Sequence, residues 1–232
     1  MAVILNIETS TPICSVALAK NGVVVAVKEN EGENLHASQL AIYIEEIFKE
    51  ANISIKDIDA VAVSEGPGSY TGLRIGVSTA KGIAYAADKK LIAVSTLQSI
   101  AIGAKLSGNF SENAWFCPMI DARRMEVFMA FYDFEGKQQS GVSAKVITEN
   151  DFEEELNLRP IVFAGNGAEK CKSLITHHNA LFIKDIKASA KYMAMLSEKN
   201  YEQKNFKDVA YFEPFYLKDF VATVSQKNVF GN

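Results

Sequence analysis

Four small polar residues follow the first apolar stretch of the chain, and they are the first group with a recognisable chemistry. The loop Glu8-Thr9-Ser10-Thr11 joins the stretch Val3–Ile7 to the stretch Cys14–Ala19. Hydroxyl and backbone N–H groups in such a loop can donate hydrogen bonds to a phosphate, and a carboxylate at a strand end can hold a magnesium-bound water. A polar hairpin turn is the ordinary alternative, because threonine and serine are common turn residues.

A glycine-rich segment, Glu65 to Gly76, is the most unusual stretch of the chain. Its glycines let the backbone approach another surface and leave amides free, but it has neither the Gly-Lys-Ser/Thr ending of a P-loop nor the Gly-x-Gly-x-x-Gly spacing of a dinucleotide loop. Beyond it, a row of small residues recurs at every fourth position: Gly72, Gly76, Ala80 and Ala84. Another backbone can pack against this row, either within the chain or from a partner.

Two further segments of the second half can approach a ligand. Asp121-Ala122-Arg123-Arg124-Met125-Glu126 is predicted at the tip of a hairpin, where its charges either orient a ligand or, more commonly, pair with one another. Gly165-Asn166-Gly167 is predicted to form a turn that can approach a nucleotide.

The histidines and cysteines do not have the spacing of a metal site. The sequence has three histidines, His36, His177 and His178, and no His-x-x-x-His pair that would place two imidazoles on one helical face. We therefore predict no metal-binding residues, no catalytic residues and no bound cofactor. The three cysteines form no Cys-x-x-Cys pair, which favours a reducing cytoplasm.

The elements that position these residues repeat one order twice. Strands are predicted at Val3–Ile7, Cys14–Ala19, Val23–Val27, Ile58–Ser64 and Leu91–Val94, and again at Trp115–Asp121, Glu126–Tyr132, Gly141–Thr148, Ile161–Ala164 and Leu181–Ile183. Helices are predicted at His36–Ala51, Tyr70–Ala87, from Ser95 or Thr96 onward, at Asp151–Leu156 with Asn150 or Asp151 as cap, from Gly167 to Thr176, and at Ser189–Lys199. Val209–Leu217 is predicted to be extended. The repeated βββαβα order indicates a duplicated α/β fold with an N-terminal lobe of residues 1–108 and a C-terminal lobe of residues 109–232.

Composition excludes several classes of protein. With 232 residues, 48% hydrophobic and 22% charged, the chain is neither disordered nor fibrous. Its 24 basic and 28 acidic side chains give a net charge of −4, which argues against broad attraction to nucleic acid. No stretch is long and apolar enough to span a membrane, and the N-terminus does not have the pattern of a signal peptide.

Four blocks of the sequence resemble the TsaB family, also called YeaZ. They are Ile4–Thr11 with Cys14–Leu18, Gly66–Gly76, Asp121–Phe128 and Pro214–Leu217. The resemblance implies an actin-like fold of the sugar kinase and heat-shock chaperone ATPase (ASKHA) type, within the glycoprotease-like superfamily. The chain departs from the family pattern at Glu8, where an aspartate is common. It also departs in the tail after Leu217, to which we assign no role.

The resemblance also implies a function. The chain is expected to be a non-catalytic subunit required for threonylcarbamoylation of the tRNA adenosine beside the anticodon, in tRNAs that read codons beginning with A. Its expected partners are a TsaD-like catalytic paralog, which carries the metal-binding histidines, and a small TsaE-like ATPase. It is expected to meet tRNA only through this complex and to associate with no membrane. On this interpretation Glu8, Thr9, Ser10 and Thr11 form a vestigial cofactor-binding loop.

A partner surface is predicted on the glycine-containing helix. Its residues are Tyr70, Gly72, Leu73, Gly76, Val77, Ala80 and Lys81, with the helix His36–Ala51 beside it. Without a partner, the same face should form a homodimer, because an exposed apolar patch is readily covered by an identical copy. Two other functions remain open: an ATP-dependent phosphotransferase or ATPase, and a metallopeptidase, with which the histidine count conflicts.

Overall fold

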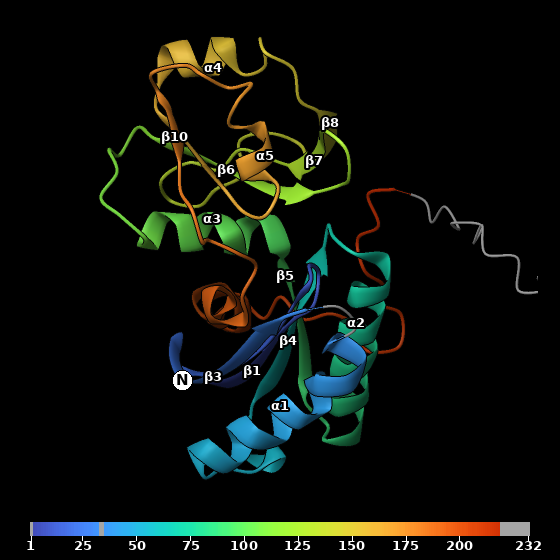
Figure 1. Ribbon diagram of the computed structural model, residues 1–232. Coiled ribbons are helices and arrows are strands. Elements are labelled where there is room, and N and C mark those ends of the chain that lie inside the picture. Colours follow the sequence, from blue (N-terminus) through green and yellow to red (C-terminus); the bar gives the residue numbers. More distant parts are fainter. Residues whose placement is uncertain (1, 33–34, 219–232) are drawn as a thin grey trace, which may run out of the picture.

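Two five-stranded mixed sheets form the framework of the chain (Figure 1). The structure is a computed structural model that describes residues 2–32 and 35–218. The first sheet has the order β3-β2-β1-β4-β5. Its strands are β1 (Val3–Glu8), β2 (Ile13–Lys20), β3 (Val23–Glu31), β4 (Ala60–Gly66) and β5 (Lys90–Ser95). The first three strands are antiparallel, whereas β1, β4 and β5 are parallel, so the polar ends of β1 and β4 lie at the same edge.

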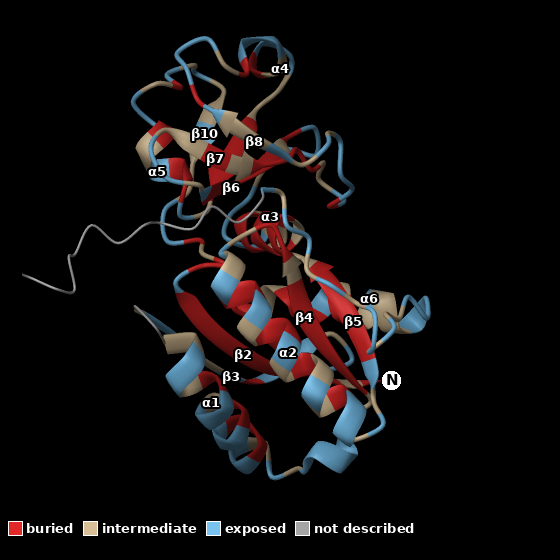
Figure 2. Ribbon diagram, turned by 90° about the vertical axis from the view of Figure 1, so that its right-hand side faces the viewer, coloured by how far each residue is buried: buried red, intermediate tan, exposed pale blue. Residues whose placement is uncertain are grey.

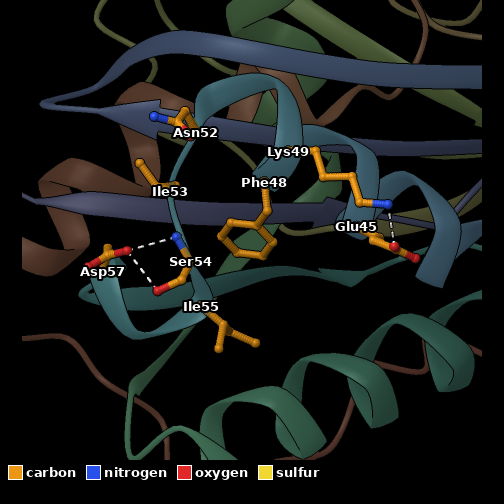
Figure 3. A pocket seen from close by; sticks show the side chains of 8 residues that line it. All are labelled: Glu45, Phe48, Lys49, Asn52, Ile53, Ser54, Ile55 and Asp57. Carbon is orange, nitrogen blue, oxygen red and sulfur yellow. Dashed lines mark hydrogen bonds and ion pairs between the residues drawn. The ribbon is translucent and has the colours of Figure 1, made fainter.

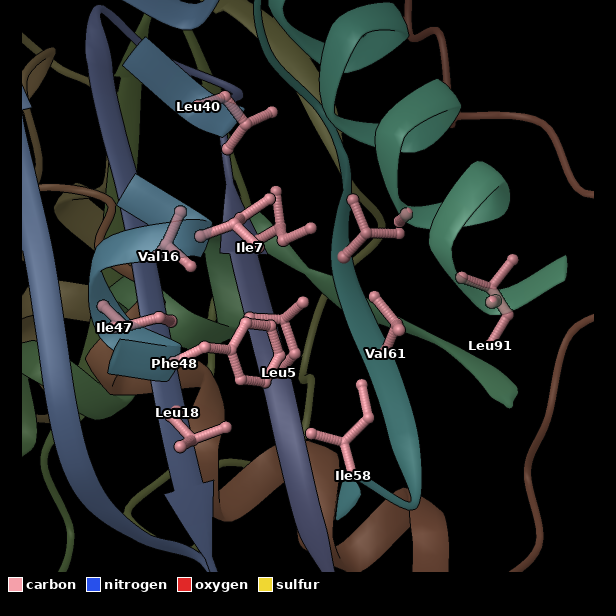
Figure 4. Packing of buried hydrophobic residues seen from close by; sticks show 14 of the residues in the cluster. Leu5, Ile7, Val16, Leu18, Leu40, Ile47, Phe48, Ile58, Val61 and Leu91 are labelled. Carbon is pink, nitrogen blue, oxygen red and sulfur yellow. The ribbon is translucent and has the colours of Figure 1, made fainter. Parts of the chain in front are cut away.

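The helices of the first lobe lie where the periodicity predicts. They are α1 (Leu35–Ala51), the short 3-10 turn η1 (Ile55–Asp57), α2 (Tyr70–Ala86) and α3 (Thr96–Leu106). Helix α1 buries Leu40, Ile44, Ile47 and Phe48, which recur at three- and four-residue steps. They pack on the face of the sheet that carries Leu5 and Ile7 (Figure 4). Ser95 caps α3 by accepting a hydrogen bond from the N–H group of Gln98.

The second sheet repeats the first. It has the order β10-β9-β6-β7-β8. Its strands are β6 (Trp115–Asp121), β7 (Glu126–Met129), β8 (Ser143–Val146), β9 (Ile161–Ala164) and β10 (Ala180–Phe182). Strand β6 pairs antiparallel with β7 and parallel with β9, as β1 does with β2 and β4. The loop after β6 therefore corresponds in topology to the Glu8–Thr11 loop after β1.

Several predicted boundaries in the second half are wrong. Helix α4 (Glu153–Leu158) begins later than predicted: Phe152 occupies the N-cap position in a left-handed conformation and makes no side-chain capping bond. Asp151 does not cap the helix, because its carboxylate accepts hydrogen bonds from Thr148. Helix α5 (Ala168–Cys171) ends well before Thr176. The helix predicted from Ser189 begins as a 3-10 turn, η2 (Ala190–Met193), and continues as α6 (Ala194–Glu202). The predicted extended segment 209–217 forms no strand in the described part of the chain.

The chain returns to the first lobe after the second sheet. Ala190 and Met193 pack against Ile4 and Ala17, on the face of the first sheet opposite to α1 (Figure 2). Helix α3 contacts β4 and β5 of the first sheet as well as β6 and β9 of the second. The division into residues 1–108 and 109–232 remains a prediction, and the structure adds that the end of the C-terminal part packs on the N-terminal sheet. The tail beyond residue 218 lies outside the described residues.

Candidate functional site

The Glu8–Thr11 loop is enclosed by the chain itself. Glu8, Thr9 and Ser10 are fully buried, and Thr11 is nearly so. The Thr9 hydroxyl donates a hydrogen bond to the carbonyl oxygen of Gly72 at 2.8 Å, and the N–H group of Ser69 donates to the carbonyl oxygen of Ser10 at 2.6 Å. The His36 ring nitrogen Nε2 lies 2.8 Å from the carbonyl oxygen of Thr11. The Thr9 hydroxyl and the Ser10 N–H group, which could donate to a phosphate, are thus engaged within the chain, whereas the Ser10 hydroxyl has no hydrogen-bond partner among the described residues. Cofactor binding by the four residues remains a prediction.

The row of small residues on α2 packs against this same loop. A methyl group added at Gly72 would come closer than 3.0 Å to the carbonyl oxygen of Thr9, and one added at Gly76 would come equally close to its hydroxyl. Leu73, Val77 and Ala80 are also buried within the lobe. The expectation that these five residues meet a partner's backbone is therefore corrected: the backbone is the chain's own. Of the predicted partner residues, Tyr70 and Lys81 are half-buried and reach the surface.

The carboxyl group of Glu8 is buried without a full set of partners. One oxygen, Oε1, accepts a hydrogen bond from the N–H group of Ser10 at 2.7 Å, whereas Oε2 has no partner. Burial raises the pKa of Glu8 above its ordinary value, and the hydroxyls of Ser10 and Ser64 beside it oppose this shift. The folded lobe therefore favours the protonated, neutral carboxyl group.

This raised pKa predicts a pH-dependent stability. Above pH 4.5, the ordinary pKa, unfolded Glu8 loses a proton that the folded chain retains, so stability falls as the pH rises towards the folded pKa. Glutamine cannot ionise, and its side-chain oxygen can still accept from Ser10. Urea unfolding should therefore show that the free energy of unfolding of Glu8→Gln, minus that of the natural chain, increases as the pH rises above 4.5. A Glu46→Gln control on the exposed face of α1 should follow the natural chain, and parallel pH profiles for Glu8→Gln would contradict the burial argument.

A cavity of about 530 Å³ lies between the lobes and brings the two corresponding loops together. Ser10 and Thr11 line it from the first lobe, and Asp121, Arg123 and Asn166 line it from the second. The structure thus joins Ser10 and Thr11 with the Asp121 loop and the Gly165–Gly167 turn, but leaves Glu8 and Thr9 outside the lining.

The carboxylates of the second loop pair with lysines from other parts of the chain. Lys170 pairs with Asp121 at 2.5 Å and donates hydrogen bonds to the carbonyl oxygens of Arg124 and Glu126. Arg123 and Arg124 adopt positive φ angles of 72° and 48°. The carboxylates of Asp121 and Glu126 are ion-paired, but with Lys170 and Lys218 from outside the segment rather than with Arg123 and Arg124, so the expected pairing within the turn is corrected.

Three residues of the cavity wall are not among the sequence-predicted site residues. Tyr216, Leu217 and Lys218 line it from the C-terminal side. They lie more than 140 positions away from the Ser69–Thr71 segment that they face, and no periodicity indicates the contact. Tyr216 and Leu217 belong to the block Pro214–Leu217, which stands out in the sequence only through its resemblance to a family.

Another hollow, of about 620 Å³, lies at the C-terminal end of α1 (Figure 3). Its polar groups pair locally: Lys49 with Glu45 at 2.5 Å, and the N–H group and hydroxyl of Ser54 with Asp57. None of the sequence-predicted residues line it. In residues 2–32 and 35–218, no three histidine, cysteine, aspartate or glutamate side chains are grouped as metal ligands, and no helix is long and apolar enough to cross a bilayer.

Comparison with known sequences gives consistent matches. A family profile described as "TsaD: tRNA N6-adenosine threonylcarbamoyltransferase" matches residues 27–226. The chain is 30% identical over 176 residues to the tRNA threonylcarbamoyladenosine biosynthesis protein TsaB of Bacillus subtilis, covering 74% of each chain. It is 39% identical over 129 residues to TsaB of Escherichia coli, and this match covers 56% of this chain and 54% of that relative. The match therefore spans about half to three quarters of the length of these relatives.

Comparison with solved structures confirms the fold. A Pseudomonas aeruginosa protein with similarity to peptidase YeaZ has a TM-score of 0.83 at 23% identity, over 94% of this chain and all of that one. The activator of 2-hydroxyisocaproyl-CoA dehydratase from Clostridium difficile, with bound ADPNP, has a TM-score of 0.50 at 12% identity, over 89% of this chain and 98% of that one. Together with the repeated sheet order, these similarities confirm the predicted duplicated actin-like fold.

Proposed function

The chain belongs to the TsaB (YeaZ) family of tRNA threonylcarbamoyladenosine biosynthesis proteins, in the glycoprotease-like superfamily, and on that premise we propose that it is a non-catalytic subunit of a threonylcarbamoyl-transferring complex. The complex acts on the tRNA adenosine beside the anticodon in tRNAs that read codons beginning with A. This chain supplies a docking surface for, and activates, a TsaD-like catalytic paralog.

The observation that supports the non-catalytic part is the close packing of α2 against Thr9 in the Glu8–Thr11 loop. Helix α2 occupies the space in front of Thr9, so that neither Gly72 nor Gly76 can carry a side chain there. The histidines support the same conclusion: His36 contacts Thr11 in the first lobe, whereas His177 pairs with Asn157 and stacks on His178 in the second. They are not arranged to hold one metal ion between them.

The partner surface that we propose is the outer face of α1 and α2. These helices lie side by side on one face of the first sheet (Figure 2). The exposed side chains in the N-terminal half of α1 carry no charge: Ala37, Ser38, Ala41 and Ile42. Exposed Thr71, Ser78 and Gly82 on α2 are likewise uncharged and small, and Arg74 is the one charged side chain exposed between Thr71 and Ser78. Such a surface permits another pair of helices to approach closely, which supports a homodimer alone and a competing heterodimer with the paralog.

The remaining parts of the proposal follow from the family and the charge. A TsaE-like ATPase joins the complex, the complex works in the cytoplasm, and tRNA is held mainly by the other subunits. The net charge of −4 supports this last point, because phosphate contacts require lysine and arginine in excess.

A reconstitution of the reaction tests the proposed function. The threonylcarbamoyl adenylate and tRNA are supplied with this chain alone, with a TsaD-like protein alone, or with both, and modified adenosine is measured by mass spectrometry. We expect product above background only when both proteins are present, with the TsaE-like ATPase needed for repeated turnover. Product from this chain alone would refute the non-catalytic assignment. An undiminished yield without this chain would refute its requirement, and ATP hydrolysis by the isolated chain would favour the phosphotransferase or ATPase alternative.

A further inference from the structure

The segment of residues 207–218, here called the strap, connects the outer edge of the first sheet to the second lobe. Its first residue pairs with β5, where the N–H group of Lys207 donates to the carbonyl oxygen of Leu91 at 2.8 Å. The strap then passes beside α2 towards the second lobe (Figure 1). It therefore follows the side of the first lobe from the edge of its sheet to the mouth of the cleft.

Helix α2 anchors the middle of the strap. The Lys81 ammonium group donates hydrogen bonds to the carbonyl oxygens of Ala210 and Phe212, at 3.1 and 3.0 Å. The side chain of Phe212 packs against the core of the first lobe. The rings of Tyr70 and Tyr216 lie 4.7 Å apart, so the helix holds the strap at both ends of this stretch.

The strap also lies directly against the end of β4. The N–H group of Phe215 donates to the carbonyl oxygen of Glu65 at 2.7 Å. A methyl group at Gly66 would come closer than 3.0 Å to the carbonyl oxygen of Phe215, so the two backbones are in close contact. The contact of Phe215 with Glu65 and Gly66 fixes the position of the next residues of the strap, 216–218.

The far end of the strap reaches the second lobe. Lys218 forms an ion pair with Glu126 at the start of β7, and its ammonium group lies 5.9 Å from the centre of the Phe128 ring. Tyr216, Leu217 and Lys218 line the cavity between the lobes, opposite Asp121 and Arg123. One short segment is thus fixed on the first lobe and bonded to the second across the cleft.

We propose that the strap is a latch that holds the cleft between the lobes closed, with the Lys218–Glu126 ion pair as its point of release. Its attachment to the first lobe consists of backbone hydrogen bonds, the two hydrogen bonds from Lys81 and the half-buried ring of Phe212. Its attachment to the second lobe is an ion pair whose lysine side chain is 46% exposed. Exposed ion pairs are weak and are screened by salt, so this end separates first. The latch does not depend on the proposed function.

Distance measurements between the lobes test the latch in the full-length chain. Spin labels are placed at Val23→Cys and Leu158→Cys, which are 67% and 72% exposed, while the three natural cysteines are buried. Pulsed electron paramagnetic resonance then compares the natural pair with Lys218→Glu, Glu126→Lys and the double exchange. We expect each single reversal to shift the ratio of open to closed molecules by about fivefold, which corresponds to about 1 kcal/mol. The double exchange should restore the natural distribution.

A matched pair within one lobe is the control. Lys49 and Glu45 form an ion pair on α1, and reversing Lys49 should leave the distance between the lobes unchanged. Raising the salt concentration should open the natural chain but not the single reversals. The proposal is overturned if both single reversals keep the natural distance distribution, or if the double exchange fails to restore it.

Discussion

Replacing Gly72 with alanine should lower the free energy of unfolding by about 2–3 kcal/mol, because the added methyl group enters a space already filled by backbone. That methyl group would come closer than 3.0 Å to the carbonyl oxygen of Thr9, which belongs to a buried loop and cannot rotate away as a side chain would. Gly76→Ala should be similarly harmful, since its methyl group would meet the Thr9 hydroxyl that donates to Gly72. Urea unfolding, followed by circular dichroism, measures both changes.

Gly82 on the same helix is the matched control. It is exposed, and a methyl group there would meet no atom within 4 Å. Alanine is favoured over glycine inside a helix, so Gly82→Ala should raise the free energy of unfolding by about 0.5–1 kcal/mol. Equal stability of Gly72→Ala and Gly82→Ala would contradict the packing of α2 against the Thr9 loop.

The same packing explains why a partner interface on the small residues was a reasonable but incorrect expectation. A row of glycine and alanine at every fourth position indicates that a backbone approaches the helix closely. It does not indicate which backbone, because Thr9 and Gly72 are 63 positions apart and only the folded chain brings them together. The sequence pattern thus indicates that another backbone lies close to the helix, but it does not identify that backbone.

Local patterns, in contrast, predicted most of the framework. Asn-Gly is a dipeptide typical of tight hairpin turns, and Asn21 and Gly22, between the two strands predicted at Cys14–Ala19 and Val23–Val27, adopt the positive φ angles of 54° and 73° that such a turn requires. The helix predicted over His36–Ala51 is also confirmed, and of the two predicted starts for the next-but-one helix, Ser95 and Thr96, Ser95 is the cap, because each feature depends on residues within four positions. The repeated βββαβα order of elements along the chain follows from applying these local rules twice.

Features that depend on distant contacts were missed. The residues of the strap have no regular period, and their positions are set by Lys81, Glu65 and Glu126, which are 92 to 150 positions away along the chain. The start of α4 was misplaced for a related reason, since Asp151 pairs with Lys145 and with Thr148 instead of capping the helix. Because the Asp151 carboxylate is bound to these two residues, it does not accept a hydrogen bond from the first turn of α4.

The proposed partner surface gives the other large effect. Ile42→Arg should weaken binding of a TsaD-like paralog by about 30-fold or more, which is about 2 kcal/mol, because a longer charged side chain would hold the two helix surfaces apart and would lose water at the contact. Ile42 is 44% exposed and lies among the uncharged residues on the outer face of α1. The same substitution should weaken self-association, since one surface is proposed to serve both contacts. Calorimetry with the paralog and analytical ultracentrifugation of the chain alone measure the two effects.

The control for this prediction separates the surface from the fold. Leu158→Arg makes the same kind of change at a residue that is 72% exposed on α4, in the second lobe. It should leave both the dimer and the complex with the paralog intact. Because both substituted side chains are exposed, each variant should keep its free energy of unfolding within about 0.5 kcal/mol of the natural chain. If Ile42→Arg is folded and binds the paralog as tightly as Leu158→Arg does, the partner surface lies elsewhere, and the outer face of α1 and α2 then has no assigned role.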